Sequence, residues 1–132
     1  MGDCASHPRP LEDIPPAALE AFRVHGQTHL SPMRFREFFI VGISELERVL
    51  GAPLWLLRTD PGDPRIQLRL LAFLRVYAGL MDLGLDPIRA GFHMRNTPIG
   101  TFEHRTLFEV VRDGQTDAAL GYLDSVGSGF VG

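Results

Sequence analysis

The sequence contains no lysine, a single cysteine (Cys4) and no long uninterrupted apolar run. One thiol can neither close an intrachain disulfide nor supply the ligands of a zinc finger, so a disulfide scaffold is excluded and a reducing compartment is predicted. No stretch approaches the roughly 18 apolar residues of a membrane span, and residues 1–10 lack the apolar run of a secretory signal. These absences predict a cytoplasmic protein with no membrane partner.

The residues that are present suit one globular domain. The chain has 132 residues, of which 45% are apolar, a share too high for a disordered protein. Its 13 arginines face 16 acidic residues, for a net charge of −3. The arginines form no dense cluster, so strong non-specific binding to nucleic acid is not expected.

Helix signals recur along the whole chain, and no alternating pattern of useful length predicts a strand. Capping residues, first-turn prolines and terminal glycines mark most of the helix boundaries. The sequence predicts an all-α fold, a compact bundle of about seven or eight mostly short helices. The first predicted helix begins at Pro15 or Pro16 and ends at Phe22 or Val24. The others cover residues 32–41, 44–50, 53–57, 64–83, 87–96, 106–112 and 116–126.

The pattern over residues 64–83 is the longest, and its apolar positions cover much of the circumference. We therefore expect it to be the central helix of the core. In the helix over residues 87–96, Ile88, Phe92 and Met94 are expected to face inward. Ser44 is expected to cap its helix, and Thr106 with Glu109 forms a capping box.

Residues 32–58 have the scale of a helix-turn-helix, with short helices separated by Gly42 and Gly51. The third helical piece is apolar, whereas a recognition helix presents polar or basic side chains to the bases. Packing or dimerisation is therefore favoured over DNA reading, and the predicted dimer interface consists of Leu54, Trp55 and Leu57. DNA binding stays open as the alternative, with phosphate contacts from Arg34, Arg36, Arg48 and Arg58.

Signals for catalysis are weak. No nucleophile elbow, phosphate-binding glycine loop or zinc-protease motif is present. His93, Glu103 and His104 form the strongest candidate cluster, but a metal site needs three or four ligands that converge on one point. We expect no metal, no cofactor and no enzyme activity.

The C-terminus places Phe130 and Val131 among Gly127, Gly129 and Gly132. An apolar tip on a glycine-rich segment either folds back on its own domain or inserts into a partner. Composition alone does not choose between these two interpretations.

The segment from Phe92 to Gly132 resembles the toxin-binding domain of the Xre/MbcA/ParS antitoxins. The resemblance depends on the loop Asn96-Thr97-Pro98 and on the tract RTLFEVVRDGQTDAALGYLDSVGSGFVG. Upstream, SPMRFREFFIVGISELERVLG and DPRIQLRLLAFLRVYAGL are similar to the helix-turn-helix half of the same family. Members of the family often carry Gly-Gly before the threonine, where this chain has Phe102-Glu103-His104-Arg105.

The resemblance implies a type II antitoxin whose partner is a RES-domain toxin that consumes NAD or transfers ADP-ribose from it. The C-terminal part of the antitoxin would pack on the toxin and obstruct its NAD cleft, with the C-terminal tip as a plug. It also implies three regions: residues 1–30 as a tail and short helix, 31–83 as the helix-turn-helix-like and dimerisation region, and 84–132 as the toxin-binding region. The implied toxin contacts are Asn96, Pro98, Phe102, Glu103, Arg105, Arg112, Asp113, Tyr122, Ser128, Gly129, Phe130, Val131 and Gly132.

Overall fold

The protein is described by a computed structural model, which covers residue 14 and residues 16–24 and 26–127. These residues form eight α-helices and one short 3-10 helix, with a single isolated β-bridge between Ile99 and Arg105. The predicted all-α bundle of short helices is confirmed. None of the described helices combines the length and the apolar character needed to cross a membrane. The elements are α1 (Pro16–Phe22), α2 (Pro32–Phe39), α3 (Ile43–Leu50), α4 (Leu54–Thr59), α5 (Pro64–Asp82), α6 (Pro87–Asn96), η3 (Gly100–Phe102), α7 (Leu107–Arg112) and α8 (Thr116–Gly127).

Side-chain caps explain where several helices begin. The Ser31 hydroxyl accepts a hydrogen bond from a backbone N–H of the first turn of α2, and the Asp86 carboxylate does the same for α6. Thr106 and Glu109 form the predicted capping box at the start of α7. The prediction for Ser44 was wrong, because α3 begins at Ile43 and has a glycine in the capping position.

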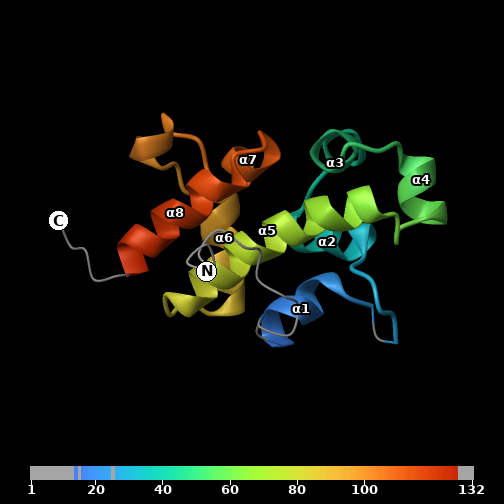
Figure 1. The fold of residues 1–132 in the computed structure, drawn as a ribbon, viewed down its shortest axis with the longest axis horizontal. Coiled ribbons are helices and arrows are strands. Elements are labelled where there is room, and N and C mark those ends of the chain that lie inside the picture. Colours follow the sequence, from blue (N-terminus) through green and yellow to red (C-terminus); the bar gives the residue numbers. More distant parts are fainter. Residues whose placement is uncertain (1–13, 15, 25, 128–132) are drawn as a thin grey trace, which may run out of the picture.

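Helix α5 is the centre of the bundle and packs against α1, α3, α6, α7 and α8. Figure 1 shows it crossing the middle of the molecule, with α1 on one side and α3 on the other. Ile66, Leu70, Phe73 and Tyr77 on α5 are all fully buried. One continuous core contains residues from both of the predicted regions 31–83 and 84–132. The predicted central helix is confirmed. Its apolar positions are not all covered, since Leu68 is 62% exposed.

Aromatic rings fill the part of the core where α1, α2, α5 and α7 meet. The rings of Phe35 and Phe73 lie 5.1 Å apart, and those of Phe73 and Phe108 lie 4.8 Å apart. Phe22 stacks on Tyr77 with a centroid distance of 5.8 Å. These edge and offset arrangements are the favourable ones for aromatic pairs. The cluster therefore connects the N-terminal helices directly to α7.

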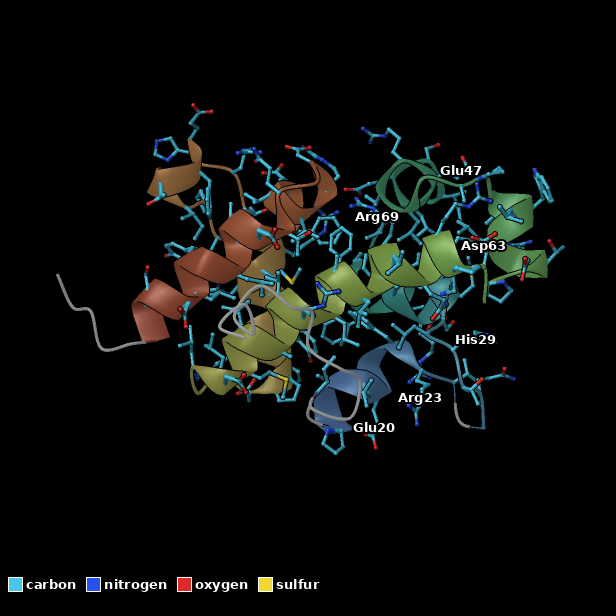
Figure 2. All side chains as sticks on the ribbon, viewed as in Figure 1. Glu20, Arg23, His29, Glu47, Asp63 and Arg69 are labelled. Atoms are coloured by element: carbon cyan, nitrogen blue, oxygen red, sulfur yellow. The ribbon has the colours of Figure 1, made fainter. Side chains whose placement is uncertain are left out.

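A half-buried arginine holds two helix ends together. The Arg69 guanidinium on α5 donates to the carbonyl of Val49 at 2.9 and 3.1 Å, to that of Arg112 at 3.1 Å and to that of Val111 at 3.4 Å. Figure 2 shows Arg69 directed from α5 toward α3. The carbonyls of Val49, Val111 and Arg112 belong to the C-terminal turns of α3 and α7, where the helix dipole favours a cation. Burial lowers the pKa of Arg69 from its usual value.

Helix α6 packs differently from the prediction, because Met94 is the only one of its three expected inward residues that is buried. Ile88 and Phe92 are 80% and 68% exposed, whereas Ala90, Gly91 and Met94 face the core. Gly91 explains the choice, because a Cβ atom there would lie 2.6 Å from the ring of Phe38. The small residue lets α2 approach closely, and the two large side chains then point outward.

Tyr77 predicts a loss of stability at alkaline pH. Its side chain is fully buried, its hydroxyl donates to the Pro87 carbonyl at 3.2 Å, and burial, with a smaller contribution from the charge of Asp86, raises its pKa to about 12. An unfolded tyrosine ionises near pH 10, so this stabilisation is complete below about pH 10 and is lost as the pH rises toward 12. We expect the free energy of unfolding to fall by roughly 2–3 kcal/mol over that interval.

Urea titrations at a series of pH values measure this effect, and Tyr77→Phe is the matched variant. The variant keeps the ring but has no ionisable hydroxyl. Its free energy of unfolding should therefore lack the fall between about pH 10 and 12 that is due to Tyr77. Identical pH dependence in the two proteins would contradict the assignment to Tyr77.

Candidate functional site

The loop after α6 is closed by backbone hydrogen bonds. The amide of Ile99 donates to the Arg105 carbonyl at 3.0 Å, and the amide of His104 donates to the Ile99 carbonyl at 3.0 Å. Ile99 itself is only 6% exposed and anchors the loop in the core. At the entrance, the side-chain amide of Asn96 donates to the Phe92 carbonyl at 3.0 Å. The loop of residues 97–106 is therefore held in one conformation by its own backbone.

Two successive residues of this loop have left-handed backbone conformations. Glu103 has φ 59° and His104 has φ 68°, and both are exposed. Glycine adopts this region freely, whereas other L-residues pay a cost of about 1–2 kcal/mol. Both residues lie within the stretch Phe102-Glu103-His104-Arg105, where the resemblance leads us to expect Gly-Gly or similar. The loop thus has the backbone geometry for which a Gly-Gly pair is suited.

We expect the double substitution Glu103→Gly with His104→Gly to stabilise the protein by about 0.5–2 kcal/mol, since it relieves two unfavourable conformations. The gain is partly offset by the larger freedom of glycine in the unfolded chain. Thermal unfolding measures the change. The matched control is Gly100→Ala, a position of the same loop without positive φ and with open space around the added methyl group. A lower melting temperature for the double variant would contradict the argument.

An arginine–aspartate–arginine group lies beside the loop, at the end of α7. One oxygen of Asp113 lies 2.9 Å from Nη1 of Arg105, and the other lies 3.0 Å from Nε of Arg112. Arg105 also donates to the Phe102 carbonyl at 3.2 Å. The hydrogen bond from Arg112, helped by that from Arg105, lowers the pKa of Asp113 below its usual value, and the same contact raises the pKa of Arg112. Asp113 is therefore a fixed negative charge at neutral pH.

An aromatic pair connects the loop to α8. The rings of Phe102 and Tyr122 lie 5.6 Å apart in an edge-to-face arrangement, and both side chains are half-buried. Figure 1 shows the loop, α7 and α8 gathered at one end of the molecule. The structure thus brings five of the predicted contact residues into one connected group. We call this group the C-terminal surface; it consists of Phe102, Arg105, Arg112, Asp113 and Tyr122.

The other predicted toxin contacts fall into two sets. Asn96, Pro98 and Glu103 are exposed on the loop or at its entrance. Residues 128–132, which include Phe130 and Val131, lie outside the described residues. The described part of the chain ends at Gly127, the last residue of α8. A Cβ atom at Gly127 would lie 2.8 Å from Cδ2 of Leu83, so the end of α8 packs closely against the end of α5.

The predicted dimer residues on α4 have different surroundings. Trp55 is 67% exposed and Leu54 is half-buried. Leu57 is only 1% exposed, so its assignment to a dimer interface was wrong: it packs inward as part of the core. The start of α4 is fixed by the Glu47 carboxylate, which accepts a hydrogen bond from the Leu54 amide at 2.6 Å.

The four arginines predicted to contact DNA are also placed differently. Arg34 donates to the Glu20 carbonyl at 3.0 Å and so is directed toward α1. Arg36 has its Nε buried without a hydrogen-bond partner. Arg48 and Arg58 are exposed on α3 and α4, which are joined by a three-residue turn. Arg34 is exposed as well, and DNA binding stays a prediction.

Neither a metal site nor a deep cleft stands out in the described residues. Within the described part of the chain, no group of three or more His, Cys, Asp or Glu side chains could hold a metal ion. A concavity beside α1 is lined partly by Glu20, Arg23 and Arg34. Figure 2 labels Glu20 on α1 and Arg23, which directly follows this helix. The concavity lies on a different part of the molecule from the C-terminal surface, and it was not predicted from the sequence.

Comparison with protein-family models, curated proteins and solved structures gives no match for this chain.

Sequence reasoning missed the exposed side chains of α6 and the residue that follows α2. Ile88 and Phe92 were assigned to the core, and Ile40, which is 85% exposed, was not singled out. For Ile88 and Phe92, the signal is the pair Ala90-Gly91 with Met94 one turn later. Small residues at 90 and 91 offer a face on which another helix can pack closely.

Proposed function

We propose that this chain is a binding protein, the antitoxin of a type II toxin–antitoxin pair, which neutralises a RES-domain toxin. The observation that carries the proposal is the left-handed pair Glu103 and His104 in the loop before α7. The left-handed region suits glycine, and the resembled antitoxins often carry Gly-Gly or similar in this loop, so the backbone here is compatible with the resemblance.

The C-terminal surface has the chemistry of a protein contact. Phe102 and Tyr122 are half-buried aromatic side chains, of the type that supplies binding energy when a partner covers them. Arg105, Arg112 and Asp113 add charged hydrogen-bonding groups next to this pair, and their mutual contacts hold them in position before a partner arrives. A partner that covers the aromatic pair would also contact these three charged side chains, which are already held in position.

In this account the antitoxin performs no chemistry itself. The toxin consumes NAD or transfers ADP-ribose from it, and the antitoxin blocks access to the NAD cleft by binding over it. Residues 128–132 directly follow α8 in the sequence. In this proposal, they are the segment that enters the cleft. Binding and obstruction are sufficient for neutralisation.

Co-expression tests the proposal. The reading frame adjacent to this gene is induced in bacteria with and without this chain, and growth and cellular NAD are followed. We expect arrest and NAD loss from the neighbour alone and relief of both by this chain. The matched pair of variants is Tyr122→Asp, which should lose protection, and Trp55→Asp, which changes an exposed aromatic residue elsewhere and should keep it. Arrest that this chain fails to relieve would overturn the proposal.

A further inference from the structure

The concavity beside α1 has the size of a small-molecule site. Its volume is about 380 Å³, near the lower end of the roughly 300–1,000 Å³ that such sites occupy. It lies between α1, the turn that follows and α2, and its lining consists of Pro16, Leu19, Glu20, Arg23, Val24, Gly26 and Arg34. None of these residues belongs to the C-terminal surface, so the proposed antitoxin function gives the concavity no role.

Backbone contacts hold the sides of the concavity in place. Phe22, the last residue of α1, is fully buried, and its carbonyl accepts a hydrogen bond from the Ser31 amide at 2.6 Å. In the turn after α1, the Gln27 amide donates to the Val24 carbonyl at 3.0 Å. Gly26 permits this turn, because its φ of 86° is a conformation that other residues adopt only at a cost. The lining is therefore formed before a ligand binds.

Two guanidinium groups line the concavity without a carboxylate partner. Nη2 of Arg34 donates to the Glu20 carbonyl at 3.0 Å, which fixes this side chain against the C-terminal turn of α1. Arg23 is exposed directly after α1, and Figure 2 shows it directed away from α5. Among the described residues, no carboxylate lies within 4.0 Å of either guanidinium. Guanidinium groups bind carboxylates and phosphates, so the ligand is expected to carry an anionic group.

The charge of the lining favours a single negative charge on the ligand. Two arginines and the exposed Glu20 give the described lining a formal charge of +1. One carboxylate balances this charge. A phosphate with two negative charges would be repelled more strongly by Glu20, because like charges at short range are unfavourable. The lining therefore suits a monocarboxylate better than a phosphate.

The rest of the lining is aliphatic. Leu19 is half-buried and packs against the core, Val24 is 40% exposed and Pro16 is exposed. None of the described lining residues is aromatic, so a nucleobase would find no ring on which to stack. An aliphatic chain that covers Leu19 and Val24 would remove apolar surface from water. The body of the ligand is therefore expected to be aliphatic.

We propose that this concavity binds a small aliphatic monocarboxylate. The carboxylate lies between Arg23 and Arg34, and the aliphatic chain covers Leu19 and Val24. A ligand held in this way connects α1 to α2 and stabilises the folded chain by mass action. The proposal does not depend on whether the chain is an antitoxin, since the C-terminal surface takes no part in it.

Calorimetric titration of the full chain with octanoate at low ionic strength tests the proposal. Octanoate should bind and should raise the melting temperature of the protein. Three further probes are titrated: acetate, which lacks the chain; octylammonium, which has the opposite charge; and inorganic phosphate, which lacks the chain and carries more charge. Each should bind at least about ten-fold more weakly, because each lacks one of the two groups that the site recognises.

Substitutions of opposite sign locate the binding. Arg23→Met should raise the dissociation constant of octanoate by about five-fold or more, because it removes a charged hydrogen bond. Glu20→Gln should lower it by about two-fold, because it removes a like charge and keeps the carbonyl that holds Arg34. The matched control is Arg58→Met, which changes an exposed arginine on α4 and should leave binding unchanged. All three side chains are exposed, so the melting temperature without ligand should stay the same.

Octanoate binding weaker than about 10 mM would overturn the proposal, since a preformed site should give a ligand of this size more affinity. Equal binding of octylammonium would show that only the aliphatic chain is recognised, and equal binding of phosphate would show a general anion site; both results contradict the proposal. The same holds if Arg23→Met leaves the dissociation constant unchanged or if Arg58→Met raises it equally.

Discussion

The substitution Arg69→Met is expected to lower the free energy of unfolding by about 2–4 kcal/mol. Methionine keeps most of the apolar stem but removes every donor of the guanidinium. The carbonyls of Val49, Val111 and Arg112 then lose a partner at the ends of α3 and α7. Part-buried carbonyls left without hydrogen bonds cost free energy, and the cation that offset both helix dipoles is gone.

Chemical denaturation of purified protein measures this change, with Arg65→Met as the matched control. Arg65 lies on the same helix, its side chain is 85% exposed and its ion pair is with the neighbouring Asp63. We expect a much smaller change for that variant, because an exposed ion pair contributes little to stability. Equal effects of the two substitutions would show that Arg69 does not hold the helix ends together.

A chain that ends at Gly127 is expected to lose neutralisation completely while it remains folded. The described core ends at Leu123, and α8 packs against Leu83 through Gly127 itself, so removal of residues 128–132 leaves these contacts in place. The deleted segment contains Phe130 and Val131, the apolar tip that we propose to enter the toxin. Loss of protection with an unchanged melting temperature would separate function from folding.

Growth under co-expression gives the functional readout for the truncated chain, and a pull-down of the toxin shows whether binding persists. The single substitution Phe130→Asp provides the matched control at constant length and should give the same loss. Full protection by the truncated chain would contradict the insertion of the segment, and neutralisation would then have to come from the C-terminal surface alone.

Local signals were enough to predict most of the fold. Ser31, Asp86 and the Thr106–Glu109 pair mark helix starts through hydrogen bonds within a single turn, so their effect is legible in the sequence. The long pattern of α5 likewise identifies the central helix, because a helix that is apolar over most of its circumference must be surrounded.

The errors come from contacts between distant residues. Ile88 and Phe92 have the spacing of a buried face, and only the close approach of Phe38 to Gly91 turns that face outward. The sequence alone does not show that Leu57 is buried and Trp55 is exposed, because the burial of each depends on how α4 packs against the core. The role of Arg69 also depends on tertiary structure, because its partners are 20 to 43 residues away in the sequence.

The C-terminal surface was predicted in part. The resemblance pointed to Phe102, Arg105, Arg112, Asp113 and Tyr122 as separate positions along 21 residues. The structure adds that they are in contact with one another through one aromatic pair and one shared carboxylate. Neither contact follows from periodicity, because η3 and its loop have no repeating pattern.

The central claim is that this chain binds an NAD-consuming partner and inhibits its NAD consumption. A titration of purified components tests this claim most directly. The protein encoded by the adjacent reading frame is incubated with NAD, and NAD consumption is measured as this chain is added. The account predicts that consumption falls in proportion to the added chain and stops at a fixed molar ratio. Consumption that continues unchanged in the presence of a large excess of this chain would contradict it.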